Sequence, residues 1–573
     1  MLDDPSFHDP RTMKPRGRFN PMISRSPWTH LAAGLLLPAL VVGASAGTPG
    51  DPNGTGPFSG VEASAAQQAD LILRGGRLLD GSGNPWVLGD LAIRADRIVG
   101  VGRLEGWVGL EEVDVTGLYV APGFIDAHSH AGPGLASEDR SHAEPQLAQG
   151  VTTLFVNPDG GGPVDLVHQR EELLEFGLGI NVAQLVPHGS IRAQIMGLDD
   201  RAPTPDELER MQALTREGME AGAFGLSSGP FYAPGSFADT GELAALASVA
   251  AEYGGIHTSH IRDEGDYSIG LVAAVDEVIE VARQTGIRSI VTHVKALGPR
   301  VWGYSGAVIR RVELARDEGL EIFTDQYPYN ASATSLAAAL VPRWAQEGGT
   351  DRMRERFDDP ALTERLQGEV LENLDRRGGA DRIQFRHHPE DPSIEGRTLD
   401  DVARARGLDP VAATLDLLRE GGPGIVSFNM DDGDIHAFMR QPWNMIASDG
   451  SFPRWGEGVP HPRSYGAFPR VIRKYVQEDG VLTLEDAIRK MTSLPALVHR
   501  MDDRGVLRAG AVADVVVFDL DQVHDRATFT DPHQLSSGMV HVFVNGRRAI
   551  RDGAVTGERA GRVLAMERAG PEE

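Results

Sequence analysis

Between residues 123 and 449, short apolar runs alternate with longer stretches in which apolar residues recur every three or four positions. Short apolar runs are typical of buried strands, and the wider spacing is typical of helices that bury one face. The runs cover residues 123–130, 150–157, 179–188, 222–228, 254–260, 287–294, 320–326 and 443–449. Eight strands that alternate with helices predict an α/β fold, a (β/α)8 TIM-like barrel.

A doubly wound open sheet is the alternative for the same alternation of strands and helices. Such a sheet commonly has a glycine-rich phosphate-binding turn after its first strand. Residues 124–130 read FIDAHSH and no glycine-rich turn follows them directly, so the pattern favours the barrel.

Two groups of short β runs flank this central part, at residues 71–102 and 513–553. Turn signals such as Asp80-Gly81 separate the runs, as is typical of a β-rich domain. We expect the two groups to pair into one small β-sandwich domain, formed by residues 67–120 and 501–558.

The barrel is expected to occupy residues 121–500. Its spacing is regular except between the seventh and eighth runs, where residues from about 336 to 435 are charge-rich and helical in pattern. This interruption predicts an inserted helical subdomain. Residues 559–573 are expected to form a tail.

The first 46 residues have the pattern of an export signal. The apolar stretch LAAGLLLPALVVGASA (31–46) follows Arg25 and ends in Ala44-Ser45-Ala46, a typical cleavage triplet. It is short for a membrane span and contains Pro38, so we expect a periplasmic or extracellular protein without stable membrane insertion after cleavage. The alternative is a disordered tail that contains an apolar stretch by chance. Met22 is an alternative to Met1 as the first residue of the protein. Residues 47–66 have the composition of a linker.

Composition narrows the classes of partner. The 573 residues include 55 Lys and Arg against 82 Asp and Glu, a formal charge of −27. Such acidity argues against nucleic acids and anionic membranes, and leaves a small-molecule substrate as the expected partner. The chain has no cysteine, which excludes disulfides, thiolate metal sites and a cysteine nucleophile. These features leave the oligomeric state open.

Histidine and aspartate side chains stand at the ends of five predicted strands. They are His128 and His130 on the first, Asp159 after the second, His260 on the fifth, His293 on the sixth and Asp449 on the eighth. In a barrel these ends meet at the mouth that holds the active site. Imidazole and carboxylate ligands suit zinc, and an open position would remain for water. A lone His-x-His or Asp-Gly is commonly structural, but their joint placement predicts a metal-hydrolase site.

Asp159 has two interpretations. It lies in Asn157-Pro158-Asp159-Gly160, which is good turn chemistry, so the carboxylate could serve only the turn. It also ends a strand beside the histidines. The two roles are compatible because the turn can aim the carboxylate, and we predict that Asp159 binds or bridges the metal.

Nine segments carry a family resemblance. They are GFIDAHSH, GVTTLFVN, GAFGLSSGPFYAPG, HTSHIRDEGD, THVKALG, DQYPYNAS, ASDG, HPRSYGAFPRV and SLPALVHRMDDRGVLRAGAVADVVVFD. In this order, from about Leu71 to Gly553, the chain resembles the N-acyl-D-amino-acid deacylases (D-aminoacylases) of the amidohydrolase superfamily. The resemblance implies a barrel with a β-sandwich and an inserted subdomain.

The resemblance also implies roles at the metal. His260 and His293 would hold a tightly bound zinc, and His128, His130 and Asp449 would line a second, weaker or vacant position. Asp449 would be the general base, which takes a proton from water and later gives it to the leaving amine.

Substrate contacts are implied at three further positions. Arg463 matches the family's carboxylate-binding arginine, Lys295 follows His293 by two residues, and Tyr327 matches a tyrosine at the substrate. A guanidinium fork suits the free carboxylate of an N-acyl amino acid. The alternatives are a structural ion pair for Arg463 and a core position for Tyr327.

Two departures from the family stand out. A serine common six residues after Tyr327 is Ala333 here, so that contact is lost or moved to Thr334 or Ser335. The family's GNCG, with its metal-binding cysteine, is replaced by the segment that contains Asp159.

Other polar residues are expected to support the site or to lie elsewhere. Asp126 is expected to orient an imidazole, and His188 is a candidate for facing the pocket. Arg262, Asp263 and Glu264 are expected to form a network behind His260. Surface or structural positions are expected for His142, His168, His436 and His461.

The expected activity is zinc-dependent hydrolysis of an N-acyl, D-configured amino acid to a carboxylate and a free amino acid. A dipeptidase acting on a carboxyl-terminal residue is the neighbouring alternative, since a dipeptide is also an N-acyl amino acid. A cyclic-amide hydrolase would not need a carboxylate clamp. A non-catalytic binding protein on the same scaffold is an alternative of another class, although such proteins typically lose metal ligands.

Overall fold

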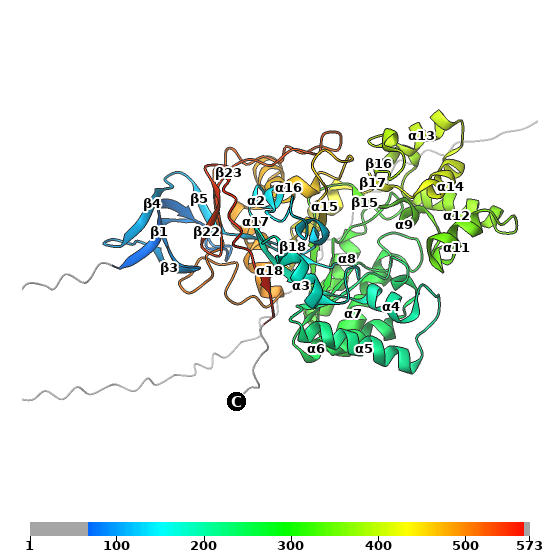
Figure 1. Cartoon of the computed structure of the whole chain (residues 1–573), viewed down its shortest axis with the longest axis horizontal. Coiled ribbons are helices and arrows are strands. Elements are labelled where there is room, and N and C mark those ends of the chain that lie inside the picture. Colours follow the sequence, from blue (N-terminus) through cyan, green and yellow to red (C-terminus); the bar gives the residue numbers. More distant parts are fainter. Residues whose placement is uncertain (1–66, 567–573) are drawn as a thin grey trace, which may run out of the picture. The chain divides into compact units, whose positions relative to one another are not determined.

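The computed structural model of the protein describes residues 67–566 (Figure 1). The predicted signal and linker, residues 1–66, lie outside the described residues, as do residues 567–573. Within the described range, no helix combines the length and apolarity that crossing a membrane requires.

Each of the eight predicted barrel strands is present. They are β6 (Phe124–Asp126), β8 (Val151–Val156), β9 (Asn181–Gln184) with β10 (Val186–Pro187), β11 (Gly225–Ser228), β12 (Ile256–Ser259), β13 (Arg288–Val291), β14 (Ile322–Gln326) and β18 (Asn444–Ile446). Parallel pairing runs β6-β8-β9 and then β10-β11-β12-β13-β14-β18. Just beyond the first and eighth strands, β7 (Ser129–His130) pairs with β19 (Gly450–Ser451). This confirms the (β/α)8 barrel.

Helices follow the strands and cover the barrel. The main ones are α3 (Leu166–Glu175), α4 (His188–Met196), α5 (Pro205–Glu220), α6 (Thr240–Glu252), α7 (Leu271–Thr285), α8 (Ser305–Asp317), α15 (Asp432–Met439) and α17 (Leu484–Met491). Local sequence explains their limits. Thr204 and Glu207 form a reciprocal capping box at the start of α5, and Gly286, with φ of 70°, ends α7 in the left-handed conformation.

Both ends of the folded chain build one β domain, as the sequence predicts. Its nine-stranded sheet has the order β23-β22-β21-β20-β5-β1-β2-β3, with β4 beside β1. The strands are β1 (Gln68–Leu78), β2 (Val87–Arg94), β3 (Arg97–Gly102), β4 (Val108–Asp114), β5 (Tyr119–Pro122), β20 (Val515–Phe518), β21 (Met539–Val544), β22 (Arg547–Arg551) and β23 (Ala554–Val555). Antiparallel pairing of β5 with β20 joins the two ends, drawn blue and brown to red in Figure 1.

The insertion after β14 is more than a helical unit. Its helices are α9 (Leu336–Leu340), α10 (Arg343–Gln346), α11 (Gly349–Phe357), α12 (Thr363–Arg376), α13 (Leu399–Arg406) and α14 (Pro410–Glu420), which enclose a hydrophobic core of their own. They pack with an antiparallel sheet of β15 (Ser332–Ser335), β17 (Gly424–Ser427) and β16 (Ile383–His387). The sheet places residues of the insertion beside the mouth of the barrel.

The expected tail, residues 559–573, contains a short strand. β24 (Val563–Leu564) pairs in parallel with β9, and Met566 N donates to Gly222 O, just before β11. This short segment therefore covers the backbone edge of β9 that β11 leaves unpaired.

Candidate metal centre and active site

Five of the six predicted metal ligands line one cavity of about 880 Å³ at the carboxyl ends of the barrel strands, and the sixth, His128, belongs to the same cluster of ligand atoms. The ligands form two groups, and within each group the ligand atoms all lie within 4.8 Å of one another. The first contains His128, His130, Asp159 and Asp449, and the second contains Asp159, His260 and His293. Among the described residues, Asp159 is the one carboxylate that belongs to both groups.

The spacing of these atoms fits a metal ion. Asp159 Oδ1 lies 3.3 Å from His128 Nε2 and 3.4 Å from His293 Nε2. Asp159 Oδ2 lies 3.3 Å from His130 Nε2 and 3.7 Å from His260 Nδ1. Zinc bonds of about 2.1 Å in tetrahedral geometry separate the ligand atoms by roughly 3.4 Å. The two oxygens of Asp159 therefore each face one or more histidine nitrogens at the separation expected of ligands that share a cation.

Unsatisfied polar atoms give an independent test of the fit. Within the described residues, His128 Nε2, Asp159 Oδ1 and both ring nitrogens of His260 are buried without a hydrogen-bond partner. Buried polar atoms rarely lack partners, and a metal would supply one. The chemistry of the donors, imidazole nitrogen and carboxylate oxygen, suits zinc.

The electrostatics of the cluster favour added positive charge. Burial alone would lower the pKa of His130, but its hydrogen bonds with Asp159 and Asp449 and the charges of both carboxylates raise it to about 9. The pKa of His293 is raised to about 10, because the pull of Glu264, Asp159 and Asp449 outweighs burial and the charge of Lys295. The carboxylates thus attract a cation, which a proton supplies in the free protein and a metal can replace.

Strained backbone aims three of these side chains. Asp159, His293 and Asp449 have φ values of 57°, 36° and 48°, in the left-handed region that non-glycine residues seldom adopt. Each such residue costs of order 1–3 kcal/mol and persists where the surroundings enforce it. At Asp159 the turn directs the carboxylate at the histidines, so a role in the turn and a role as a ligand are compatible in the structure.

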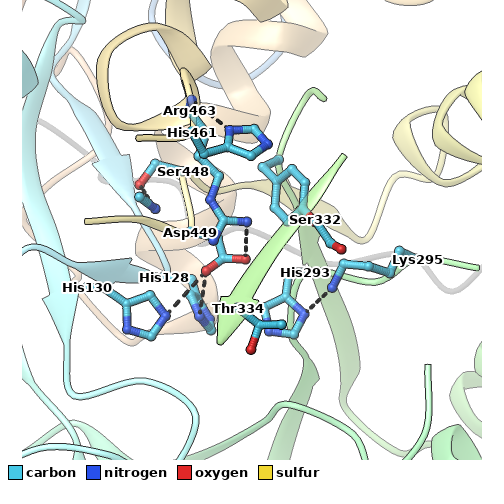
Figure 2. A network of polar contacts seen from close by, with 12 residues as sticks. His128, His130, His293, Lys295, Ser332, Thr334, Ser448, Asp449, His461 and Arg463 are labelled. Carbon is cyan, nitrogen blue, oxygen red and sulfur yellow. Dashed lines mark hydrogen bonds and ion pairs between the residues drawn. The ribbon is translucent and has the colours of Figure 1, made fainter. Parts of the chain in front are cut away.

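Glu264 contacts His293 more closely than the sequence suggested. Its Oε1 lies 3.0 Å from His293 Nδ1 and 2.5 Å from Lys295 Nζ, and Nζ is 2.8 Å from the same Nδ1 (Figure 2). A proton on Nδ1, donated to Glu264, leaves Nε2 free to bind a metal. Lys295, predicted to bind substrate, lines the cavity but is already paired with this carboxylate.

Arg463 joins the predicted substrate clamp to the predicted base. Its Nη1 donates to Asp449 Oδ2 at 2.7 Å (Figure 2), and its guanidinium lies 4.7 Å from the centre of the Tyr327 ring. His461 Nδ1 accepts from Arg463 N, and His461 Nε2 lies 3.0 Å from Ala331 O. His461 is thus buried in the cavity wall and supports Arg463. Its sequence context had indicated a surface or structural position.

Two aspartates support the strand ends through the backbone. Asp126 accepts from His128 N and from the backbone and hydroxyl of Ser448, so it does not orient an imidazole as expected. Asp325, which the sequence interpretation missed, accepts from His293 N at 2.6 Å. Its signal was its place at the end of the seventh strand, in line with the other acids.

Ala333, which stands where the family commonly has a serine, lines the cavity together with Thr334 and Ser335. Thr334 Oγ1 donates to Tyr232 Oη at 3.3 Å. Other polar residues lie outside the site: His188 pairs with Glu242 and Arg262 pairs with Glu277. Asp263 accepts hydrogen bonds from its own loop, residues 265–270. His142, His168 and His436 do not line the cavity.

Comparison with known proteins shows the family of the chain. The model of the Amidohydrolase family (Amidohydro_3) matches residues 177–550. An N-acyl-D-glutamate deacylase from Alcaligenes xylosoxydans xylosoxydans is 36% identical over 524 residues, which cover 87% of this chain and 97% of the relative. The chain belongs to the amidohydrolase family, in its D-aminoacylase branch. A D-aminoacylase from the same organism is 34% identical to this amidohydrolase, over 88% of this chain and 99% of the relative.

Solved structures agree with this assignment. The N-acyl-D-glutamate deacylase of Bordetella bronchiseptica, solved with zinc and a phosphonate inhibitor, superposes with a TM-score of 0.74 and 34% identity. A D-aminoacylase structure described by its binuclear metal centre gives the same TM-score at 30% identity. Each comparison covers 87% of this amidohydrolase and 100% of the solved chain.

Proposed function

We propose that this amidohydrolase is an exported, zinc-dependent deacylase that hydrolyses N-acyl-D-amino acids to a carboxylate and a free D-amino acid. The observation that carries the proposal is the single cavity in which Asp159 joins two groups of metal-ligand atoms and Arg463 lies beside Asp449. The relatives named above as deacylases of N-acyl-D-amino acids support it. Export is supported by the pattern of residues 31–46.

The residues divide into a metal-binding set and a substrate-binding set. His260, His293 and Asp159 would hold one zinc, and His128, His130, Asp449 and Asp159 would line a second position. Bound zinc supplies Lewis acidity, which lowers the pKa of a water to about 7 and polarises the acyl carbonyl.

Proton transfer falls to Asp449. It accepts a proton as water adds to the acyl carbon and donates that proton to the amine as the C–N bond breaks. Arg463 holds this carboxylate in place through Nη1 and can present its remaining N–H groups to the substrate α-carboxylate. The Tyr327 ring beneath the guanidinium limits its motion.

A dipeptide with a carboxyl-terminal D-residue presents the same amide bond and the same free carboxylate. Because the cavity is about 880 Å³, it can accommodate an aminoacyl group in place of a simple acyl group. Dipeptides therefore belong among the substrates to be assayed.

The Asp449→Asn variant tests the proposal. Zinc-loaded wild type is expected to release free amine from N-acetyl-D-amino acids, and Asp449→Asn to lose at least about a hundredfold in kcat. Asp521→Asn, at an exposed position outside the cavity, is the matched control and is expected to keep wild-type kcat. Equal kcat in both variants would contradict the assignment of Asp449 as the base.

A further inference from the structure

Four lysine and arginine side chains line the cavity, and they differ in their partners. Lys295 is paired with Glu264, and Arg463 is paired with Asp449. Among the described residues, no carboxylate oxygen lies within 4.0 Å of Arg377 or Arg386. Both arginines come from the inserted subdomain, so the part of the cavity wall that the insertion forms contributes positive charge without internal counterions.

The backbone around Arg386 departs from a regular strand. Arg386 lies at a bulge in β16, where Phe385 pairs with Ile425 and His387 pairs with Gly424. A bulge leaves the extra residue unpaired and can redirect its side chain. Gly424 provides the space beside it, since a Cβ there would lie 2.6 Å from Arg386 Nε.

Arg386 is partly buried, and its Nε lies inside the protein without hydrogen-bonding compensation. Within the described residues its Nε has no partner, and no carboxylate pairs with the guanidinium. Burial and the charge of Arg463 lower the pKa of Arg386, whereas Tyr232 and Asp449 raise it, which places the group in the field of the catalytic centre. Partial removal of an unpaired cation from water is unfavourable, so this arrangement suits a site that receives an anion.

Arg377 adds a second, fixed charge to the same wall. It follows α12, is 1% exposed, and donates from Nε to Tyr267 Oη at 2.8 Å and from Nη1 to Ser427 Oγ at 3.0 Å. Both partners are neutral hydroxyl groups, which position the guanidinium without cancelling its charge. The cavity therefore has a second arginine whose charge no carboxylate of the described residues neutralises.

We propose that Arg386 binds a second carboxylate of the substrate, so that the preferred substrates are N-acyl amino acids with two carboxylates. The inference rests on the proposed function, in which Arg463 takes the α-carboxylate. The second carboxylate can belong to an acidic amino-acid side chain or to a dicarboxylic acyl group, and the same guanidinium chemistry would recognise either.

Substrate pairs that differ only in charge test the proposal. The kcat/KM of zinc-loaded wild type is expected to be at least about tenfold higher for N-acetyl-D-glutamate than for N-acetyl-D-glutamine. A preference for N-succinyl-D-alanine over N-acetyl-D-alanine would place the second carboxylate on the acyl group instead. In either case the Arg386→Met variant is expected to bring the ratio near one, mainly through KM.

Two further variants separate binding from folding. Gly424→Ala keeps Arg386 but displaces it, and is expected to reduce the same ratio while the neutral substrate is still hydrolysed. Arg386→Lys, which keeps the charge without the fork, is expected to retain part of the preference. Arg352→Met, on the exposed surface of the insertion, is the matched control and should leave the ratio unchanged.

The outcomes distinguish the two proposals. If neutral and dicarboxylic substrates are hydrolysed with equal kcat/KM, or if Arg386→Met changes both alike, the second-carboxylate inference is overturned and the deacylase proposal stands. If zinc-loaded wild type hydrolyses no N-acyl amino acid of either charge, the proposed function itself fails.

Discussion

Arg463 Nη1 donates a 2.7 Å hydrogen bond to Asp449 Oδ2, so one contact links the predicted substrate clamp to the predicted base. Replacing Arg463 by alanine is expected to raise KM for N-acyl amino acids at least about tenfold, because the α-carboxylate loses its cationic partner. Asp449 would also lose its buried counterion, so kcat should fall as well. Steady-state kinetics measure both, and an unchanged KM would remove Arg463 from the substrate site.

Asp159 is expected to determine metal retention. The Asp159→Asn variant keeps the shape of the side chain but loses its charge, so bound zinc and kcat should both fall while the circular dichroism spectrum stays that of wild type. Asp159→Cys, which restores a ligand of the family type, is the matched control and should keep more zinc than Asp159→Asn. Wild-type zinc content and rate in Asp159→Asn would reduce Asp159 to a turn residue.

Metal removal should affect stability as well as activity. An ion that binds only the folded chain stabilises it, by about 2.7 kcal/mol when present at one hundred times its dissociation constant. Chelation is therefore expected to abolish hydrolysis and to lower the thermal unfolding midpoint, and added zinc should restore both. A midpoint and a rate that do not change on chelation would contradict a metal at this cluster.

His499 should make stability depend on pH. Its ring is buried against Phe155, and burial lowers its pKa to about 4 even though Nδ1–H donates to Pro495 O. The unfolded chain takes up this proton near pH 6.5, so His499 lowers the stability of the folded state as the pH falls from about 6.5 towards 4.

Between pH 7 and pH 5 this loss amounts to about 2 kcal/mol. In the variant His499→Phe, the decrease of the thermal midpoint between these pH values is expected to be smaller than in wild type. Equal decreases in the two proteins would show that His499 does not titrate in this way.

The barrel and the cluster could be predicted because each rests on a local pattern. A buried strand of a parallel sheet is a short apolar run, and the residue that follows it lies at the barrel mouth whatever the rest of the chain does. His260 and Asp449 could thus be brought together in space although 189 positions separate them in the sequence.

The features that were missed depend on partners far apart in the chain. Ser332 of β15 pairs with Ser427 of β17 across the whole insertion, so the helical pattern between them gave no sign of a sheet. Asp325 was overlooked because it serves a backbone N–H on the neighbouring strand rather than a ligand atom. The bulge at Arg386 is visible only in the register of paired strands.

The most direct test of the account measures the release of free amine from paired D- and L-N-acyl amino acids, and from dipeptides, by the zinc-loaded protein. The account predicts hydrolysis of the D-isomers, with kcat/KM about a hundredfold or more above that of the L-isomers, and loss of that activity when zinc is removed. Absence of hydrolysis of every D-substrate at full zinc occupancy would contradict it.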